Sequence, residues 1–235
     1  FLACCTQGWP LATLFNSQQY NLPIDVNDGT KSSVEGGMEV RYWEGGLLAF
    51  EVEAIESMAK AFRPTKVPSQ PIAGPAKGKS FEVLKGLKKS EPTTLMYPWK
   101  GYAGFRFANS RGSEGEFDLV IIMHSMVLVV ELKHWKGKIT SHAGKWHQNG
   151  KEQGPSPVEK TRRKAFELKK KLEAIRAKLP EGKIPWVEFC VVLSADCTFE
   201  LPENEKPYVM RLDDFLQLAD EQRFKQRYPR NQRGS

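Results

Sequence analysis

Two acidic residues and a lysine in the middle of the chain have the types and spacing for metal-assisted hydrolysis. They are Asp118, Glu131 and Lys133. Paired carboxylates suit a hard divalent cation, because such cations prefer oxygen ligands. A lysine ammonium beside them can orient a water molecule or stabilise charge that builds on a phosphoryl oxygen, while the metal activates the attacking water. The three residues therefore predict a hydrolytic centre, provided that the fold brings them together.

A β-hairpin is the element that must position these side chains. Two apolar runs, 117–123 and 126–133, are separated by His124 and Ser125. This pattern predicts two antiparallel strands joined by a tight turn. Both strands are apolar on both faces in their middles, which is typical of central strands covered by helices.

The position of the turn fixes the register of the hairpin. Facing residues have numbers that sum to 249, so Asp118 lies opposite Glu131 and Glu116 lies opposite Lys133. Side chains alternate between the two faces of a strand, which places all four on one face. Facing acids destabilise a purely structural hairpin. A salt-bridge cluster at the end of the sheet is the structural alternative. Glu116 is either a further metal ligand or a partner of Lys133, and the partner role is favoured.

The hairpin and the residues after it resemble the nuclease-related domain (NERD) family of the PD-(D/E)XK nuclease superfamily. The resemblance covers roughly residues 78–215. It is carried by Glu116-Phe117-Asp118, by the string from Val130 to Ile139, by Gly144-Lys145-Trp146 with Gly150, and by Ser156-Pro157-Val158.

This resemblance implies a fold and a site. The fold is α/β, with a restriction-endonuclease-like core whose mixed sheet of four or five strands is flanked by helices near 80–89 and 157–179. Asp118 and Glu131 bind Mg²⁺ or Mn²⁺, the backbone carbonyl of Leu132 is a further ligand, and Lys133 positions the attacking water. The implied activity is hydrolysis of phosphodiester bonds.

Two positions depart from the family pattern. Relatives often carry a glutamine where this chain has Lys160, and they place a glutamate early in the helix before the hairpin. In that helix Ser80 takes the expected position, so Glu82 becomes the candidate for a further metal ligand. These departures favour the main alternative, a nucleic-acid-binding or interaction module that keeps the nuclease fold without turnover.

The charge of the chain predicts a polyanionic partner. The net charge is +7, and residues 1–37 contain a single basic residue, Lys31, against three acids, so the basic part contains the predicted site. Nucleic acid is the commonest such partner, and DNA is the expected form. The predicted phosphate contacts are Lys136, Lys160, Arg162, Arg163 and Lys164. A solvated helix face is the alternative interpretation of the four that lie on the long helix.

Proline and glycine divide the chain. Residues 1–62 are expected to form a partly ordered extension with one helix at 47–62, residues 63–78 a linker, residues 79–220 the nuclease-like domain and residues 221–235 a basic tail. Further strands are predicted at 102–108, 186–193 and 208–212, and a closing helix at 213–219.

Other classes of function are less well supported. The segment 73–80 fits a permissive phosphate-loop pattern with Lys79, but Pro68 and Pro71 stand where a buried strand must lead into such a loop. The longest aliphatic run, 127–130, is too short to span a bilayer. Four cysteines without zinc spacing leave a reducing cytoplasm as the expected location.

Overall fold

The structure is a computed structural model that describes residues 37–43, 46–62, 100–108, 114–123, 126–179 and 182–229. The expected helix at 80–89, with Ser80 and Glu82, lies outside these residues, as does the phosphate-loop pattern at 73–80. The turn at 124–125 also lies outside them.

The centre of the described fold is a six-stranded mixed sheet with the order β1-β2-β3-β4-β8-β10. Its strands are β1 (Glu39–Tyr42), β2 (Lys100–Ala108), β3 (Glu114–Ile122), β4 (Met126–Lys133), β8 (Trp186–Leu193) and β10 (Val209–Arg211). β3 is antiparallel to both of its neighbours, whereas β1, β8 and β10 pair in parallel. The sheet has one strand more than the four or five expected.

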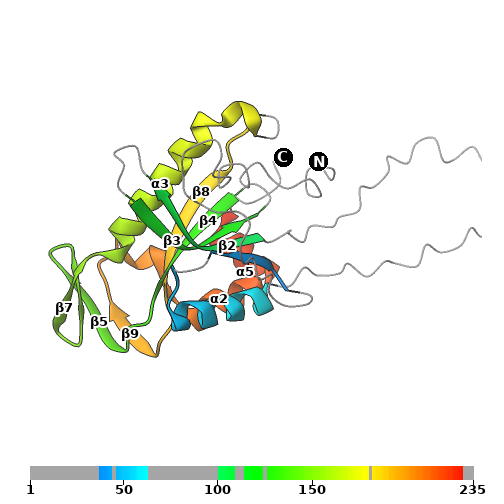
Figure 1. Ribbon diagram of the computed structural model, residues 1–235. Helices are drawn as coiled ribbons and strands as arrows, with labels where there is room; N and C mark the ends of the chain where they lie inside the picture. Colours follow the sequence, from blue (N-terminus) through cyan, green and yellow to red (C-terminus); the bar gives the residue numbers. More distant parts are fainter. Residues whose placement is uncertain are drawn as a thin grey trace, which may run out of the picture.

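Helices cover both faces of this sheet (Figure 1). α3 (Pro157–Ala174) packs on one face, and α2 (Ala49–Ala61), α4 (Leu212–Leu216) and α5 (Glu221–Arg227) pack on the other. Three short 3-10 helices follow at 176–178, 206–208 and 217–219. Residues of β4 contribute alternately to the two cores and are buried from Met126 to Leu132. The α/β class with a mixed sheet flanked by helices is therefore confirmed.

The register of the hairpin agrees with the sequence. β3 and β4 pair from Leu119↔Val130 to Ile122↔Val127, so facing numbers sum to 249. β8 then pairs in parallel with β4 along eight positions, from Met126↔Trp186 to Lys133↔Leu193. The crossover between these parallel strands contains α3, as parallel pairing requires.

A second, four-stranded sheet follows β4 and was not predicted. It has the order β7-β6-β5-β9 and is called the small sheet below. Its strands are β5 (Gly137–His142), β6 (Lys145–Gln148), β7 (Lys151–Pro155) and β9 (Cys197–Glu200). The two hairpin turns place Ala143-Gly144 and Asn149-Gly150 at positive φ, as two-residue turns of this kind require.

The small sheet is tied to the rest of the fold by buried polar and aromatic contacts. Trp146 is fully buried, and its indole Nε1 donates a hydrogen bond of 2.7 Å to the buried carboxylate of Glu205. Trp135 packs edge-on against Trp146 at 6.0 Å. Both tryptophans therefore pack the small sheet against the core.

The segments expected to flank the domain take part in it. β1 extends the central sheet, and Ile55 and Met58 of α2 are fully buried in one core. At the other end, Phe224 and Tyr228 are buried in the same core. The described packing therefore runs from about residue 38 to residue 228.

Candidate metal and hydrolytic site

The carboxylates gather where the two strands of the hairpin separate. The last paired residues are Leu119 and Val130, and beyond them the amide of Leu132 donates a 2.6 Å hydrogen bond to Oδ2 of Asp118 instead of to a β3 carbonyl. Asp118 and Glu131 are only 8% and 6% exposed. Two carboxylates therefore lie side by side with little access to water.

Glu131 is held by two lysines from different elements. Its Oε1 accepts a 2.7 Å hydrogen bond from Nζ of Lys133 on β4, and its Oε2 accepts one of 2.5 Å from Nζ of Lys164 on α3. Lys133 also donates to the backbone carbonyl of Leu132 at 3.0 Å. The ammonium group of Lys133 thus donates to Oε1 of Glu131 and to the carbonyl of Leu132, both of which are predicted metal ligands.

The two carboxyl groups have opposite affinities for a proton. Burial, and next the charge of Glu131, raise the pKa of Asp118 to about 7, although Lys164, Lys133 and the Leu132 amide oppose this shift. Burial by itself raises the pKa of Glu131, but Lys133 and Lys164 outweigh it and hold that pKa below its ordinary value. Near neutral pH, Glu131 is therefore ionised, and Asp118 is the carboxyl group of the pair that binds a proton.

The charge of Lys133 is stabilised in return. Burial by itself lowers the pKa of this lysine, but Glu131 and Asp118, with a smaller contribution from Glu51, raise it above its ordinary value. Lys133 is consequently a permanent cation at the end of β4. Its position suits a group that stabilises developing negative charge.

The donor set fits a hard divalent cation. Burial, and next the charge of Glu131, disfavour the ionised form of Asp118, and a divalent cation bound beside it would offset this cost. No three Asp, Glu, His or Cys side chains among the described residues form a metal cluster. Asp118 and Glu131 are the two buried carboxylates that this site offers to a hard divalent cation.

Glu51 is a buried acid near this site that the sequence analysis did not single out. It is 8% exposed, it lies in the first turn of α2, and its charge reaches Lys133. Its Oε2 accepts a 2.8 Å hydrogen bond from the amide of Leu48. The expectation that Glu82 is a further metal ligand stays a prediction, because Glu82 lies outside the described residues.

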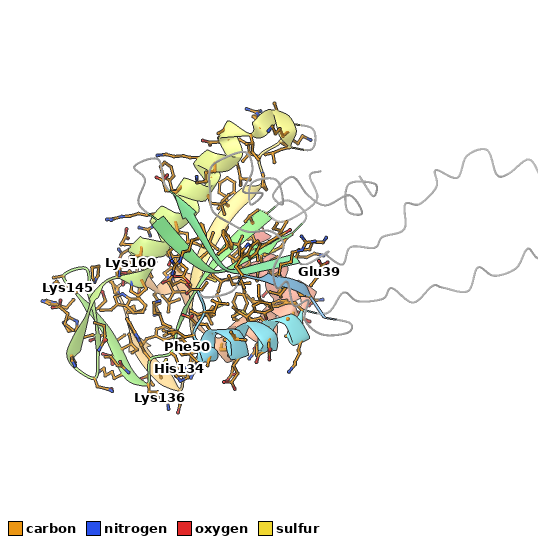
Figure 2. The ribbon with its side chains drawn as sticks, viewed as in Figure 1. Glu39, Phe50, His134, Lys136, Lys145 and Lys160 are labelled. Carbon is orange, nitrogen blue, oxygen red and sulfur yellow. The ribbon has the colours of Figure 1, made fainter. Side chains whose placement is uncertain are left out.

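His134 fixes the end of β4 against α2. Its ring stacks on Phe50 at 5.0 Å and its Nδ1 lies 3.1 Å from Oγ of Ser194. Figure 2 shows the two rings beside each other at the start of α2. His134 therefore has a packing role at the edge of the site.

The predicted phosphate contacts divide into three groups. Lys164 points into the carboxylate site. Arg162 pairs with Glu159 and lies over the rings of Phe189 and Tyr208, so its guanidinium takes part in packing. The others, Lys136, Lys160 and Arg163, are exposed.

Glu116 does not pair with Lys133 of β4, the partner that the sequence predicted. It lies opposite Arg106 of β2, and its buried Oε1 has no hydrogen-bond partner in the described part of the chain. Lys133 bonds with Glu131 and Leu132. The Glu116–Lys133 pair is therefore not formed.

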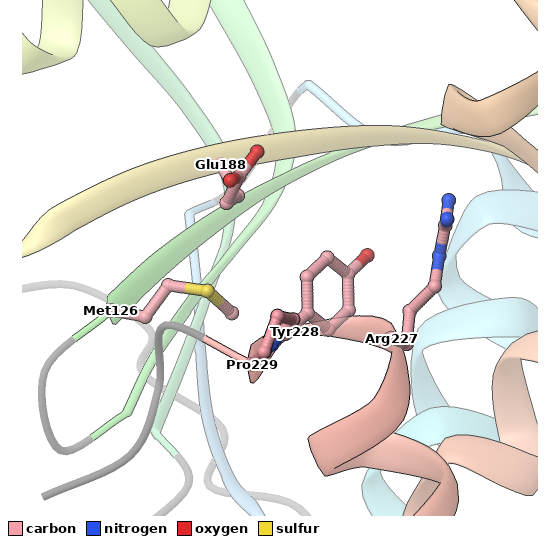
Figure 3. A pocket seen from close by; sticks show the side chains of 5 residues that line it. All are labelled: Met126, Glu188, Arg227, Tyr228 and Pro229. Atoms are coloured by element: carbon pink, nitrogen blue, oxygen red, sulfur yellow. The ribbon is translucent and has the colours of Figure 1, made fainter.

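A small pocket lies at the opposite end of β4. It is lined by Met126, Glu188, Arg227, Tyr228 and Pro229 (Figure 3). Met126 begins β4 whereas the carboxylate site lies at its last residues. This pocket is therefore separate from the carboxylate site.

Comparisons with known proteins identify the family of the chain. The family model described as "Nuclease-related domain" matches residues 77–194, half of the chain. The chain is also similar to a protein of Streptomyces coelicolor named "Probable kinase PglW", at 28% identity over 126 residues. That match covers 52% of this chain but 8% of the PglW protein. No solved structure matches the chain.

In the described part, no helix is both long enough and apolar enough to cross a membrane.

Proposed function

The chain belongs to the nuclease-related domain family, within the PD-(D/E)XK-like nuclease superfamily, and from this premise we propose that it is a metal-dependent cytoplasmic nuclease that hydrolyses phosphodiester bonds of DNA. Domains of this superfamily are generally associated with divalent metals. The observation that carries the proposal is the convergence of Asp118, Glu131 and Lys133 at the open end of the hairpin.

The metal ion would be held by Asp118, Glu131 and the carbonyl of Leu132, and it would supply Lewis-acid activation of water and of the scissile phosphate. Mg²⁺ or Mn²⁺ suits these oxygen donors. The amide of Leu132 fixes Oδ2 of Asp118 at 2.6 Å, which presets that carboxylate for binding. Glu82, which lies outside the described residues, remains a proposed further ligand.

Lys133 is the residue that acts on the reacting groups. Its Nζ is aligned by Oε1 of Glu131 and the carbonyl of Leu132, so its remaining proton can be donated to water or to a phosphoryl oxygen. Its raised pKa keeps it protonated across the physiological range. Lys133 thus positions the attacking water and stabilises charge on the phosphate.

Lys164 has a positioning role. It binds the second oxygen of Glu131 and so prevents this carboxylate from turning away from the site. Because it comes from α3, it couples the orientation of Glu131 to the packing of this helix against β4.

The direct test is cleavage of labelled single- and double-stranded DNA by the purified chain in Mg²⁺ or Mn²⁺. Cleavage is expected with metal, and EDTA, Glu131→Ala and Lys133→Ala should each abolish it. The matched control is Glu152→Ala, because Glu152 is an exposed acid of the small sheet that lies outside the site. Equal activity of the Glu131 and Glu152 variants would contradict the proposal.

The second candidate is a nucleic-acid-binding module without turnover. It is favoured by Lys160, which replaces a common family glutamine, and by the two lysines that occupy both oxygens of Glu131. This alternative predicts retention of DNA without cleavage under every metal tested.

A kinase activity is a weaker candidate. The name of the Streptomyces coelicolor relative belongs to a protein of which the matched region is 8%. If the segment 73–80 is a phosphate loop, ATP should bind to the chain, and Lys79→Ala should abolish that binding.

A further inference from the structure

The positive charge of the chain is concentrated in one continuous segment. Residues 134–178 contain 13 lysines and arginines against 4 glutamates, a net charge of +9. Since the whole chain has a net charge of +7, the remaining residues together have a net charge of −2. The segment begins directly after Lys133 and forms β5, β6, β7 and α3. The excess charge therefore lies on the small sheet and on α3, next to the carboxylate site.

The lysines of the small sheet are of two kinds. Lys138 pairs with Glu200 at 2.8 Å, and Lys145 pairs with Glu152 at 2.7 Å. In contrast, Lys136 and Lys151 are exposed, and neither has an ion-pair partner among the described residues. Their charges are therefore uncompensated, although Lys136 directly precedes β5 and Lys151 is the first residue of β7.

Side chains of the β6–β7 turn fix the backbone between these two unpaired lysines. Gln148 and Asn149 donate hydrogen bonds of 3.0 and 3.4 Å to the carbonyl of Lys136, and Asn149 accepts one of 2.8 Å from the amide of Lys138. Gln148 lies opposite Lys151 in the ladder. The β6–β7 turn, which precedes Lys151, is thus hydrogen-bonded to the segment that follows β4.

Unpaired cations also occur on the α3 side of the site. Lys160 precedes Lys164 by one helical turn on the same face, and Lys164 contacts Glu131. Lys160 and Arg163 are exposed without an ion-pair partner in the described part of the chain. Figure 2 shows Lys160 on α3 and Lys136 where the chain enters the small sheet, so the unpaired cations come from two separate elements.

We propose that Lys136 and Lys151 form a second phosphate-binding surface, which holds nucleic acid on the small-sheet side of the carboxylate site while Lys160 and Arg163 hold it on the α3 side. This inference rests on the proposed nuclease function. Ammonium groups recognise the backbone phosphates and not the bases, so this surface contributes affinity that does not depend on sequence. The ties through Gln148, Asn149 and Trp146 make the surface rigid before substrate binds.

The test is the salt dependence of DNA binding by the full chain in EDTA, measured by fluorescence anisotropy with a labelled duplex. For Lys136→Ala/Lys151→Ala, the slope of log K against log salt should fall by about two, because each phosphate that a lysine neutralises contributes close to one. Lys136→Arg/Lys151→Arg should restore the slope. The matched control is Lys138→Ala/Lys145→Ala, which removes two lysines that are already ion-paired on the same sheet and should leave the slope nearly unchanged.

Three results would overturn the proposal: an unchanged slope for the first pair, an equal loss for both pairs, and no DNA binding by the unmodified chain. Thermal unfolding of each variant checks that the exposed substitutions leave the fold intact. Cleavage in Mg²⁺ separates this proposal from the nuclease function. If cleavage requires Glu131 but the slopes are equal, only the second surface is wrong, whereas if the slope falls without any cleavage, the nuclease function is wrong.

Discussion

The central sheet and the small sheet both carry acids and lysines, but they hold them in opposite ways. At the end of β4, Asp118 and Glu131 are almost fully buried and their pKa values move in opposite directions. On the small sheet, Lys138 and Lys145 have half-exposed side chains in surface ion pairs. The same residue types therefore form a strongly interacting cluster in one sheet and weakly interacting pairs in the other.

This difference follows from the dielectric environment of each sheet. Buried charges interact strongly and can be tuned for chemistry, whereas exposed pairs are screened by water and salt and contribute little. Burial suits the hydrolytic step, and exposure suits reversible contacts with phosphates. Four experiments can sharpen or break this comparison.

The largest effect is expected for a pair of lysine variants, one from each sheet. Lys133→Ala should lower the rate of DNA cleavage at least 100-fold, roughly the effect of removing one group that stabilises a transition state. Lys138→Ala, in which the lost lysine is ion-paired at the surface, should change the rate less than twofold. If the two variants lost similar amounts of the single-turnover cleavage rate, burial would not explain a difference in role between the two lysines.

Lys164→Met should produce the next largest effect. It removes one of the two ammonium groups on Glu131 but keeps an unbranched apolar stem. We expect cleavage to fall about tenfold, because a hydrogen bond to a charged group contributes roughly 1.5–3 kcal/mol. The Mg²⁺ concentration that stabilises the protein should also fall, because one cation fewer competes for Glu131. Titration of Tm with Mg²⁺ measures this, and Lys169→Met, at an exposed position of the same helix, is the control.

Asp118→Asn should change how stability depends on pH. Because the folded protein raises the pKa of Asp118 from 3.8 to about 7, it binds more protons than the unfolded chain between these values and loses stability as the pH rises. Asparagine removes this loss. In EDTA, the stability of the variant relative to the unmodified chain should therefore be greater at pH 8 than at pH 5, by about 2 kcal/mol or roughly 5 °C in Tm.

A matched substitution at the surface tests this pH effect. Asp196→Asn changes an exposed acid just before β9 and should shift Tm equally at both pH values. The lowered pKa of Glu131 does not interfere, because its contribution is lost below its ordinary value of 4.5 and therefore below pH 5. If Asp118→Asn changed Tm equally at pH 5 and pH 8, the raised pKa of Asp118 would be contradicted.

The smallest effect is expected for Asn149→Gly. The substitution removes the hydrogen bonds to Lys136 and Lys138 while keeping a residue that accepts the positive φ of 51° at this turn. Thermal unfolding should show a loss of about 1 kcal/mol, and cleavage should change less than threefold. Asn204→Gly, at an exposed position outside the site, serves as the control. A large loss of cleavage would show that the small sheet also determines the geometry of the carboxylates.

The sequence predicts the central sheet better than the small one. Long apolar runs at 117–133 and 186–193 specify buried strands, and the register of the β3–β4 hairpin follows from the turn position. The small sheet has short, polar strands, so hydrophobic periodicity gives a weak signal there. Asn149-Gly150 between two short alternating segments was the available sign of a hairpin.

The candidate site was predicted in part. Asp118, Glu131 and Lys133 are close in sequence and share one hairpin, so local register brings them together. Glu51 and Lys164 reach the site from α2 and α3, and only tertiary packing determines which polar residue of a helix turns inward. Their contribution depends on contacts between distant segments that periodicity does not specify.

The parallel alignment of β4 with β8 makes the burial of the two carboxylates depend on a distant part of the chain. The partners Met126 and Trp186 are separated by the whole of the small-sheet hairpins and α3. Pairings of such high contact order form slowly. A nascent chain that has emerged only as far as Lys133 therefore holds the acids of the hairpin in water. Their unusual proton affinities arise only after translation has passed Leu193 and the crossover has closed over them.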